Sequence, residues 1–119
     1  MRIAIGSDHR GYDLKEKLTG ILRSKGHDVS DEGPAFTEAV DYPDFAALVS
    51  QKVSDGTTER GILICGTGIG MAITANKYPG VRAAPITDEV TAEISRRHND
   101  LNVLCLSADM LSPSSAERM

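Results

Sequence analysis

The stretch that decides the fold is Gly61-Ile-Leu-Ile-Cys65-Gly66-Thr67-Gly68-Ile69-Gly70-Met71-Ala-Ile-Thr-Ala-Asn76-Lys77. Its continuous apolar run before the cysteine is typical of a strand that is covered on both faces. Three alternating glycines follow, which let the backbone approach a ligand closely, and small residues then favour a helix. A strand, a glycine turn and a helix in this order predict a parallel α/β sheet with a ligand site at the turn.

The rest of the chain repeats the alternation of strands and helices. Apolar runs predict strands at 2–6, 27–30, 60–65, 81–86 and 102–106, and helical periodicity predicts helices at 12–25, 43–56, 71–77 and 88–97. We therefore expect one Rossmann-like domain over residues 1–119, a three-layer α/β/α arrangement around a five-stranded parallel sheet. The pattern also calls for a closing helix, but the polar residues 107–119 indicate that it is missing or shortened.

The first predicted helix carries its apolar residues on one face. Leu14, Leu18 and Leu22 follow a helical spacing, whereas Lys15 lies off that face. We therefore expect Lys15 on the solvated side of the helix.

The composition excludes several classes of protein. A net charge of −4 and an aromatic content of 4% argue against a basic nucleic-acid surface and against base stacking. No apolar stretch is long enough to span a bilayer, so no membrane partner is expected. Cys65 and Cys105 are too few for a disulfide framework or a cysteine-based zinc site, which predicts a cytoplasmic protein without a metal.

Three segments with reactive side chains are expected at the carboxyl ends of the strands, where open parallel sheets bind their ligands. They are Asp8-His9, Cys65-Gly66-Thr67 and His98-Asn99. The third segment follows a helix, so it needs a length of loop to reach the same edge.

Each of these features also has a purely structural interpretation. Cys65 is of a type that often ends a strand as a small buried apolar residue, and the glycine turn can be a tight connection. Asp8 can cap a turn, and His9 and His98 can be surface histidines. The glycine pattern is neither a phosphate-binding Walker loop nor a dinucleotide fingerprint, because no Gly-Lys-Ser/Thr follows and Met71 stands where the last glycine would be.

Taken together, the three segments suit one chemistry. A cysteine base, the Thr67 hydroxyl, backbone N–H donors and an acid–base histidine are the groups needed to move a proton next to a carbonyl. Such a reaction passes through an enediolate and requires no cofactor.

Four motifs resemble the ribose-5-phosphate isomerase B / galactose-6-phosphate isomerase family. They are Ile-Gly-Ser-Asp8-His9-Arg-Gly-Tyr, Asp41-Tyr42-Pro43-Asp44, the stretch from Gly61 to Lys77, and Arg97-His98-Asn99-Asp100. The resemblance covers residues 2–106. It implies an aldose–ketose isomerase that acts on ribose 5-phosphate and ribulose 5-phosphate or a related sugar pair, without a cofactor. It also implies a homodimer with its active sites at the subunit interface.

The resemblance assigns a role to each candidate residue. Cys65 is similar to the general base, and Thr67 with the amides of Gly66, Gly68 and Gly70 is similar to the enediolate site. His98 and Asp8 match positions linked to opening the furanose ring. His9 matches a phosphate contact, and Tyr42 and Asn99 match positions that line the sugar site. Met71 stands where one branch of the family has a glutamate base, so the chain resembles the cysteine branch.

Two departures from the family pattern keep other functions open. Asp109 stands where an arginine that binds phosphate is expected, which reverses the local charge. The sequence given also ends at Met119, before the further arginines of the family. These departures favour two alternatives, an isomerase of a non-phosphorylated sugar or a non-catalytic subunit that binds sugar. A flavodoxin-like or nucleotide-binding module is suggested by the fold pattern alone.

Overall fold

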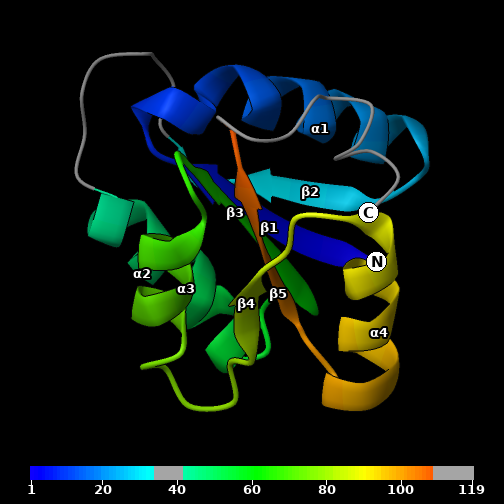
Figure 1. Cartoon of the computed structure of the whole chain (residues 1–119). Helices are drawn as coiled ribbons and strands as arrows, with labels where there is room; N and C mark the ends of the chain where they lie inside the picture. The colour runs from blue at the N-terminus through cyan, green and yellow to red at the C-terminus, as the bar shows by residue number, and fades with distance from the viewer. Residues whose placement is uncertain (34–41, 109–119) are drawn as a thin grey trace.

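Five parallel strands form a single sheet in the computed structural model (Figure 1), which describes residues 1–33 and 42–108, without the side chains of Tyr42 and Pro43. The strand order is β2-β1-β3-β5-β4. The strands are β1 (Arg2–Ser7), β2 (Asp28–Asp31), β3 (Arg60–Cys65), β4 (Ala83–Pro85) and β5 (Val103–Ser107). The predicted five-stranded parallel sheet is therefore confirmed.

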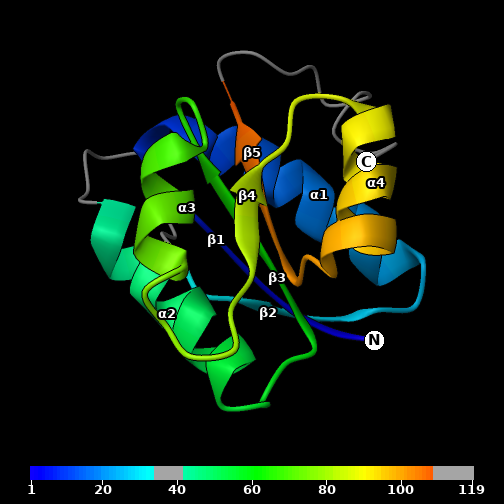
Figure 2. The same cartoon turned by 60° about the horizontal axis from the view of Figure 1, so that its bottom comes forward.

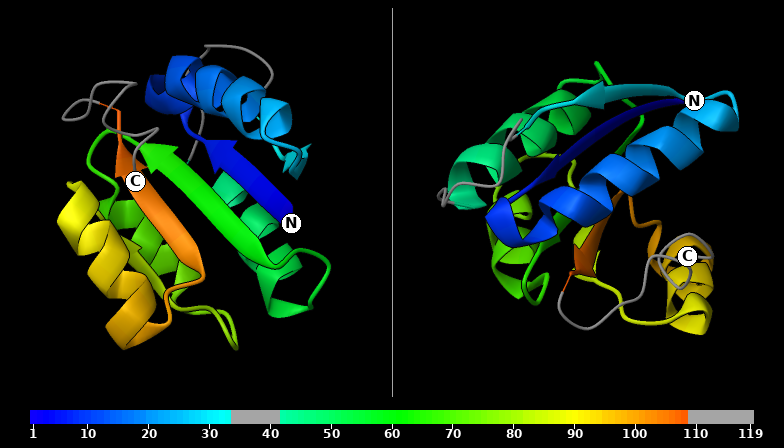
Figure 3. Two further views of the ribbon diagram at one scale, coloured as in Figure 1. Left: turned by 90° about the vertical axis from the view of Figure 1, so that its right-hand side faces the viewer. Right: turned by 90° about the horizontal axis from the view of Figure 1, so that it is seen from above.

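Helices cover both faces of the sheet, which confirms the predicted three-layer arrangement. They are α1 (Tyr12–Ser24), α2 (Tyr42–Ser54), α3 (Ile69–Ala75) and α4 (Glu89–Asn99), with a short 3-10 helix η1 (His9–Gly11) before α1. Figures 2 and 3 show α2 and α3 on one face and α1 and α4 on the other. None of the helices in the described part is long and apolar enough to cross a membrane.

The apolar run of β3 is explained by this double coverage. Leu63 belongs to the buried cluster under α2 and α3, together with Val49 and Met71. Its neighbour Ile64 belongs to the cluster under α1, because successive side chains of a strand point to opposite faces. Both side chains are fully buried, so neither position can carry a polar group without cost.

The prediction for Lys15 was wrong, because its side chain is fully buried. The reason lies in the helix geometry. Lys15 is about 100° from Leu14 and about 60° from Leu18 around the axis of α1, so it borders the apolar face. Thr19, one turn further along, is buried beside it.

Several boundaries differ from the sequence prediction by one or two residues. Helix α4 continues through His98 and Asn99, which were expected in a loop. It ends there because Asp100 takes a left-handed conformation with φ of 50° and donates its N–H to the Ser95 carbonyl. Helix α3 begins at Ile69, two residues before the predicted start. The expectations for Asp109, for residues 109–119 and for a closing helix lie outside the described residues.

Candidate active site

The carboxyl ends of β1, β3 and β5 meet at one edge of the sheet and bring two predicted segments together. Ser7 pairs with Ile64, and Cys65 pairs with Ser107. The Asp8 N–H donates to the Ile64 carbonyl at 3.0 Å, directly before Cys65. The Asp8-His9 segment and the glycine turn are therefore neighbours, as the sequence predicted.

The sulfur of Cys65 lies inside the turn that the glycines form. The residue is 5% exposed, and the Gly68 N–H donates to Sγ at an N···S distance of 3.0 Å. Gly68 has a φ of 83°, which a residue with a side chain rarely adopts. The N–H dipole points its positive end at the sulfur.

The other residues of the turn are held in place as well. The Thr67 hydroxyl accepts the Ile69 N–H at 3.2 Å, and Thr67 is exposed. The Gly66 carbonyl accepts a hydrogen bond from the Ser107 hydroxyl. Gly70 lies inside α3. The turn therefore presents the Thr67 side chain outward, while the Gly68 amide is directed at the sulfur.

Asp8 performs the capping role that its structural interpretation proposed. It is 8% exposed, and its Oδ1 accepts the N–H groups of Arg10 and Gly11, each at 3.0 Å. This fixes η1 and holds the half-buried His9 next to the sheet edge. The capping bonds do not conflict with a role in the reaction, since the carboxylate has a second oxygen.

His98 and Asn99 lie at the opposite edge of the sheet, so the expectation that they reach the edge of Cys65 within one chain was wrong. The Asn99 carbonyl accepts the Arg82 Nε–H at 2.7 Å, just before β4 begins. The length of β5 separates this edge from the edge of Cys65, and it is about 13 Å. The reason is the direction of α4, which returns antiparallel to the strands and ends before β5 starts (Figure 2). Both residues are exposed.

Two other expectations concern Tyr42 and a metal. Tyr42 is the first residue of α2, but its side chain lies outside the described residues. Within residues 1–33 and 42–108, no group of three or more histidine, cysteine or acidic residues could hold a metal ion.

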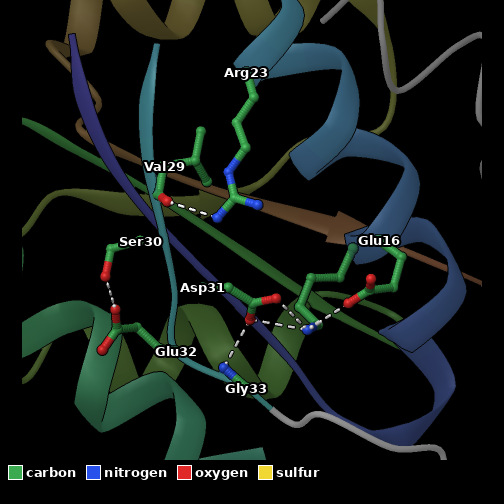
Figure 4. Close-up of polar contacts among 8 residues, drawn as sticks. Glu16, Arg23, Val29, Ser30, Asp31, Glu32 and Gly33 are labelled. Carbon is green, nitrogen blue, oxygen red and sulfur yellow. Dashed lines mark hydrogen bonds and ion pairs between the residues drawn. The ribbon is translucent and has the colours of Figure 1, made fainter.

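Sequence reasoning missed the polar residues behind the site. Lys15 binds Asp31 at the end of β2, and Asp31 binds the backbone of Gly33 (Figure 4). The available signal was the position of Lys15 beside the apolar face of its helix. Asp31 followed by Gly33 is also a pattern that favours a side-chain-capped turn.

The fold and the site together define a class of protein. It is a three-layer α/β domain with a cysteine in a glycine turn at the carboxyl edge of its sheet. A model of the ribose/galactose isomerase family matches residues 3–119. Ribose-5-P isomerase B of Listeria innocua is 47% identical over 116 residues, which make up 98% of this chain and 78% of that protein. The chain therefore belongs to the ribose/galactose isomerase family.

Solved structures agree with this assignment. Ribose-5-phosphate isomerase B of Clostridium thermocellum has a TM-score of 0.96 and 47% identity, over 98% of this chain and 78% of that one. Ribose-5-phosphate isomerase B of Mycoplasma genitalium, solved with bound ribulose-5-phosphate, has a TM-score of 0.95 and 44% identity, over the same shares. Identity at this level extends the likeness from the fold to the family.

Proposed function

We propose that this chain interconverts ribose 5-phosphate and ribulose 5-phosphate, with Cys65 as the general base. The observation that carries the proposal is the buried Cys65 sulfur, which receives the Gly68 N–H at the carboxyl edge of the sheet. The names of the relatives and the ribulose-5-phosphate bound to one of them support the choice of sugar. The proposal places the enzyme in the cytoplasm, where its two free cysteines stay reduced.

The reaction proceeds as a proton transfer between two carbons. In the open-chain aldose, the Cys65 thiolate removes the proton from C2, and the electron pair of that bond forms the C1–C2 double bond. The negative charge that develops on O1 is stabilised by Thr67 and the glycine amides. The hydroxyl proton on O2 passes to O1, and the Cys65 thiol returns its proton to C1, which leaves the ketone at C2.

The remaining candidate residues act on the rest of the sugar. Asp8 and His98 open the furanose ring by moving a proton to its ring oxygen, as general acid–base catalysis requires. His9 contacts the phosphate, and Tyr42 and Asn99 line the sugar site. All five assignments come from the family resemblance.

We further propose that a second copy of the chain completes the site. His98 and Asn99 are separated from Cys65 of the same chain by the length of β5, about 13 Å. In this proposal they therefore act from another subunit. Large apolar side chains are exposed on the two helices involved: Ile69 and Ile73 on α3, and Val90 and Ile94 on α4. A groove of about 520 Å³ beside β4 and α4, which includes Ile94 and Asn99, adds to this surface.

Choice of sugar is tested by comparing ribose 5-phosphate with ribose. We expect much faster turnover of the phosphorylated sugar, measured as ketose formed per unit time. Turnover of ribose but not of ribose 5-phosphate would instead support an isomerase of a non-phosphorylated sugar, the alternative that Asp109 suggests. Calorimetric binding of ribose 5-phosphate without turnover of either sugar would support a non-catalytic subunit.

The shared site is tested by mixing two inactive variants, Cys65→Ala and His98→Ala. A random mixture of subunits leaves both side chains intact in about a quarter of the sites if each site takes Cys65 from one subunit and His98 from the other. We therefore expect about a quarter of the wild-type activity after the two variants are unfolded and refolded together. Each variant refolded alone is the control. A mixture as inactive as the controls would contradict a site shared between subunits.

A further inference from the structure

Lys15 is a buried cation that the proposed reaction does not use. Its side chain is 0% exposed, and Nζ lies 2.8 Å from both carboxylate oxygens of Asp31. Nζ also lies 3.1 Å from the Glu16 carboxylate and 5.1 Å from the centre of the Tyr12 ring. Removing an ammonium group from water is costly, and a buried ion pair often gives no net stability over apolar residues. This arrangement therefore calls for a role other than stability.

The ion pair holds a turn at the end of β2. Asp31 is the last residue of β2, and its Oδ1 accepts the Gly33 N–H at 2.9 Å while it also binds Lys15. Figure 4 shows the Asp31 carboxylate directed at the backbone nitrogen of Gly33. Gly33 has a φ of 105°, a conformation that glycine adopts without strain because it has no side chain. Lys15 and Asp31 thus hold the Gly33 N–H and, through it, the backbone of Gly33.

The backbone of Gly33 in turn holds the residue before Asp8. Its carbonyl accepts the Ser7 N–H at 3.0 Å. Ser7 ends β1, and the next residue, Asp8, is anchored on its other side by the Ile64 carbonyl. A continuous series of hydrogen bonds therefore runs from Lys15 through Asp31 and Gly33 to the start of the Asp8-His9 segment.

Attachment of α1 to β2 does not depend on Lys15. Arg23 of α1 donates from Nη2 to the Val29 carbonyl of β2 at 3.0 Å (Figure 4). Leu14, Leu18 and Val29 share one buried cluster across the same contact. The ion pair is therefore not needed to dock the helix, whereas the Asp31 oxygen that binds Gly33 is held by Lys15.

We propose that Lys15 is a positioning residue of the active site, which places Asp8 and His9 by holding Asp31 against the Gly33 backbone. This inference rests on the proposed function only in its prediction for activity. The proposed role of Lys15 is indirect, because its side chain is fully buried and cannot itself contact the sugar.

Two variants separate positioning from stability. Lys15→Met removes the cation and leaves the Asp31 carboxylate without its partner, so both thermal stability and activity fall. Lys15→Met/Asp31→Leu replaces the pair by apolar side chains, which restores stability toward the wild type but leaves the Gly33 N–H without its acceptor. We expect kcat/KM for ribose 5-phosphate to be lower by at least about tenfold in both variants. Val103→Ala is the control, because Val103 is fully buried at the opposite edge of the sheet. We expect this variant to lose stability. Its kcat/KM, measured at a temperature well below its melting temperature, should equal that of the wild type.

Amide hydrogen exchange gives a readout that does not depend on turnover. In the double variant, the Ser7 and Gly33 amides should exchange faster than in the wild type, while the Ala4 amide inside β1 keeps its protection. If the wild-type protein shows no turnover, the proposed function is contradicted. Amide hydrogen exchange then decides the role of Lys15 on its own. Normal kcat/KM together with unchanged exchange at Ser7 and Gly33 in the double variant would overturn the proposal, as would activity that returns in step with stability. If Lys15→Met fails to fold, the double variant carries the test alone.

Discussion

The Cys65→Ala variant is expected to lose isomerase activity by a factor of about 10² to 10⁴, the usual contribution of a general base. The methyl group cannot accept the C2 proton, and the Gly68 N–H loses the sulfur to which it donates. The fold should persist, because the substitution removes only the sulfur atom and adds no atom to a largely buried position. The rate of ribulose 5-phosphate formation measures the loss, and circular dichroism checks the fold.

Cys105→Ala is the matched control for this prediction. Cys105 is the second buried cysteine of the chain and lies on the strand next to Cys65. Burial, and to a smaller extent the charge of Cys65, raises the pKa of Cys105 to about 12, so it stays a neutral thiol at working pH. We expect kcat to be unchanged in this variant. Loss of activity in Cys105→Ala together with full activity in Cys65→Ala would contradict the assignment of Cys65 as the base.

The Gly11→Ala variant is expected to destabilise the protein by about 3 kcal/mol, since extra atoms in a tightly packed position force the backbone to move. A Cβ at Gly11 would lie 2.7 Å from both Cγ2 and the carbonyl oxygen of Ile64. That carbonyl also accepts the Asp8 N–H, and the Gly11 N–H binds the Asp8 carboxylate. The change should therefore lower activity together with the free energy of unfolding, which denaturant titration measures.

Gly20→Ala tests whether this effect belongs to the position rather than to glycine itself. Gly20 lies inside α1, and a Cβ there meets no atom within 4 Å. Alanine in a helix is more favourable than glycine, so we expect this variant to gain about 0.5–1 kcal/mol of stability. A similar loss of stability in both variants would show that the contact between Gly11 and Ile64 does not determine the effect.

The core of the site could be predicted because its signals are local in the sequence. The apolar run before Cys65 and the glycines after it specify a buried strand and a turn, and both are found where expected. The parallel sheet then places Asp8 beside this turn, since the carboxyl ends of its strands share one edge. A general rule of sheet topology was therefore sufficient for these two segments.

The way in which His98 could take part in the site could not be derived from the topology of one chain. A helix between two parallel strands returns to the amino edge, so residues at its end cannot join the carboxyl edge of the same chain. The sequence motif that includes His98 and Asn99 resembles a site motif, but a contact with another subunit leaves no local signal in one chain. The observed separation is consistent with the homodimer that the family resemblance implies, and not with the expected convergence within one chain.

The burial of Lys15 was missed for a different reason. Helical periodicity assigns a charged residue beside the apolar face to solvent, unless a partner across the contact is known. Asp31 is that partner, 16 residues further along the chain. No spacing rule connects a lysine in a helix with an aspartate at the end of the next strand. Only the packing of α1 on the sheet brings them together.

The central claim, proton transfer by Cys65, is tested most directly by incubating ribose 5-phosphate with the enzyme in D₂O well past equilibrium. The sugar carbons are then examined by proton NMR. Because the thiol can exchange its proton with solvent between the two transfers, repeated interconversion should introduce deuterium at C1 of the ketose and C2 of the aldose. Cys65→Ala should introduce none in the same time. Equilibrium reached by the wild type while both carbons keep their original hydrogen would indicate a direct hydride shift and contradict the account.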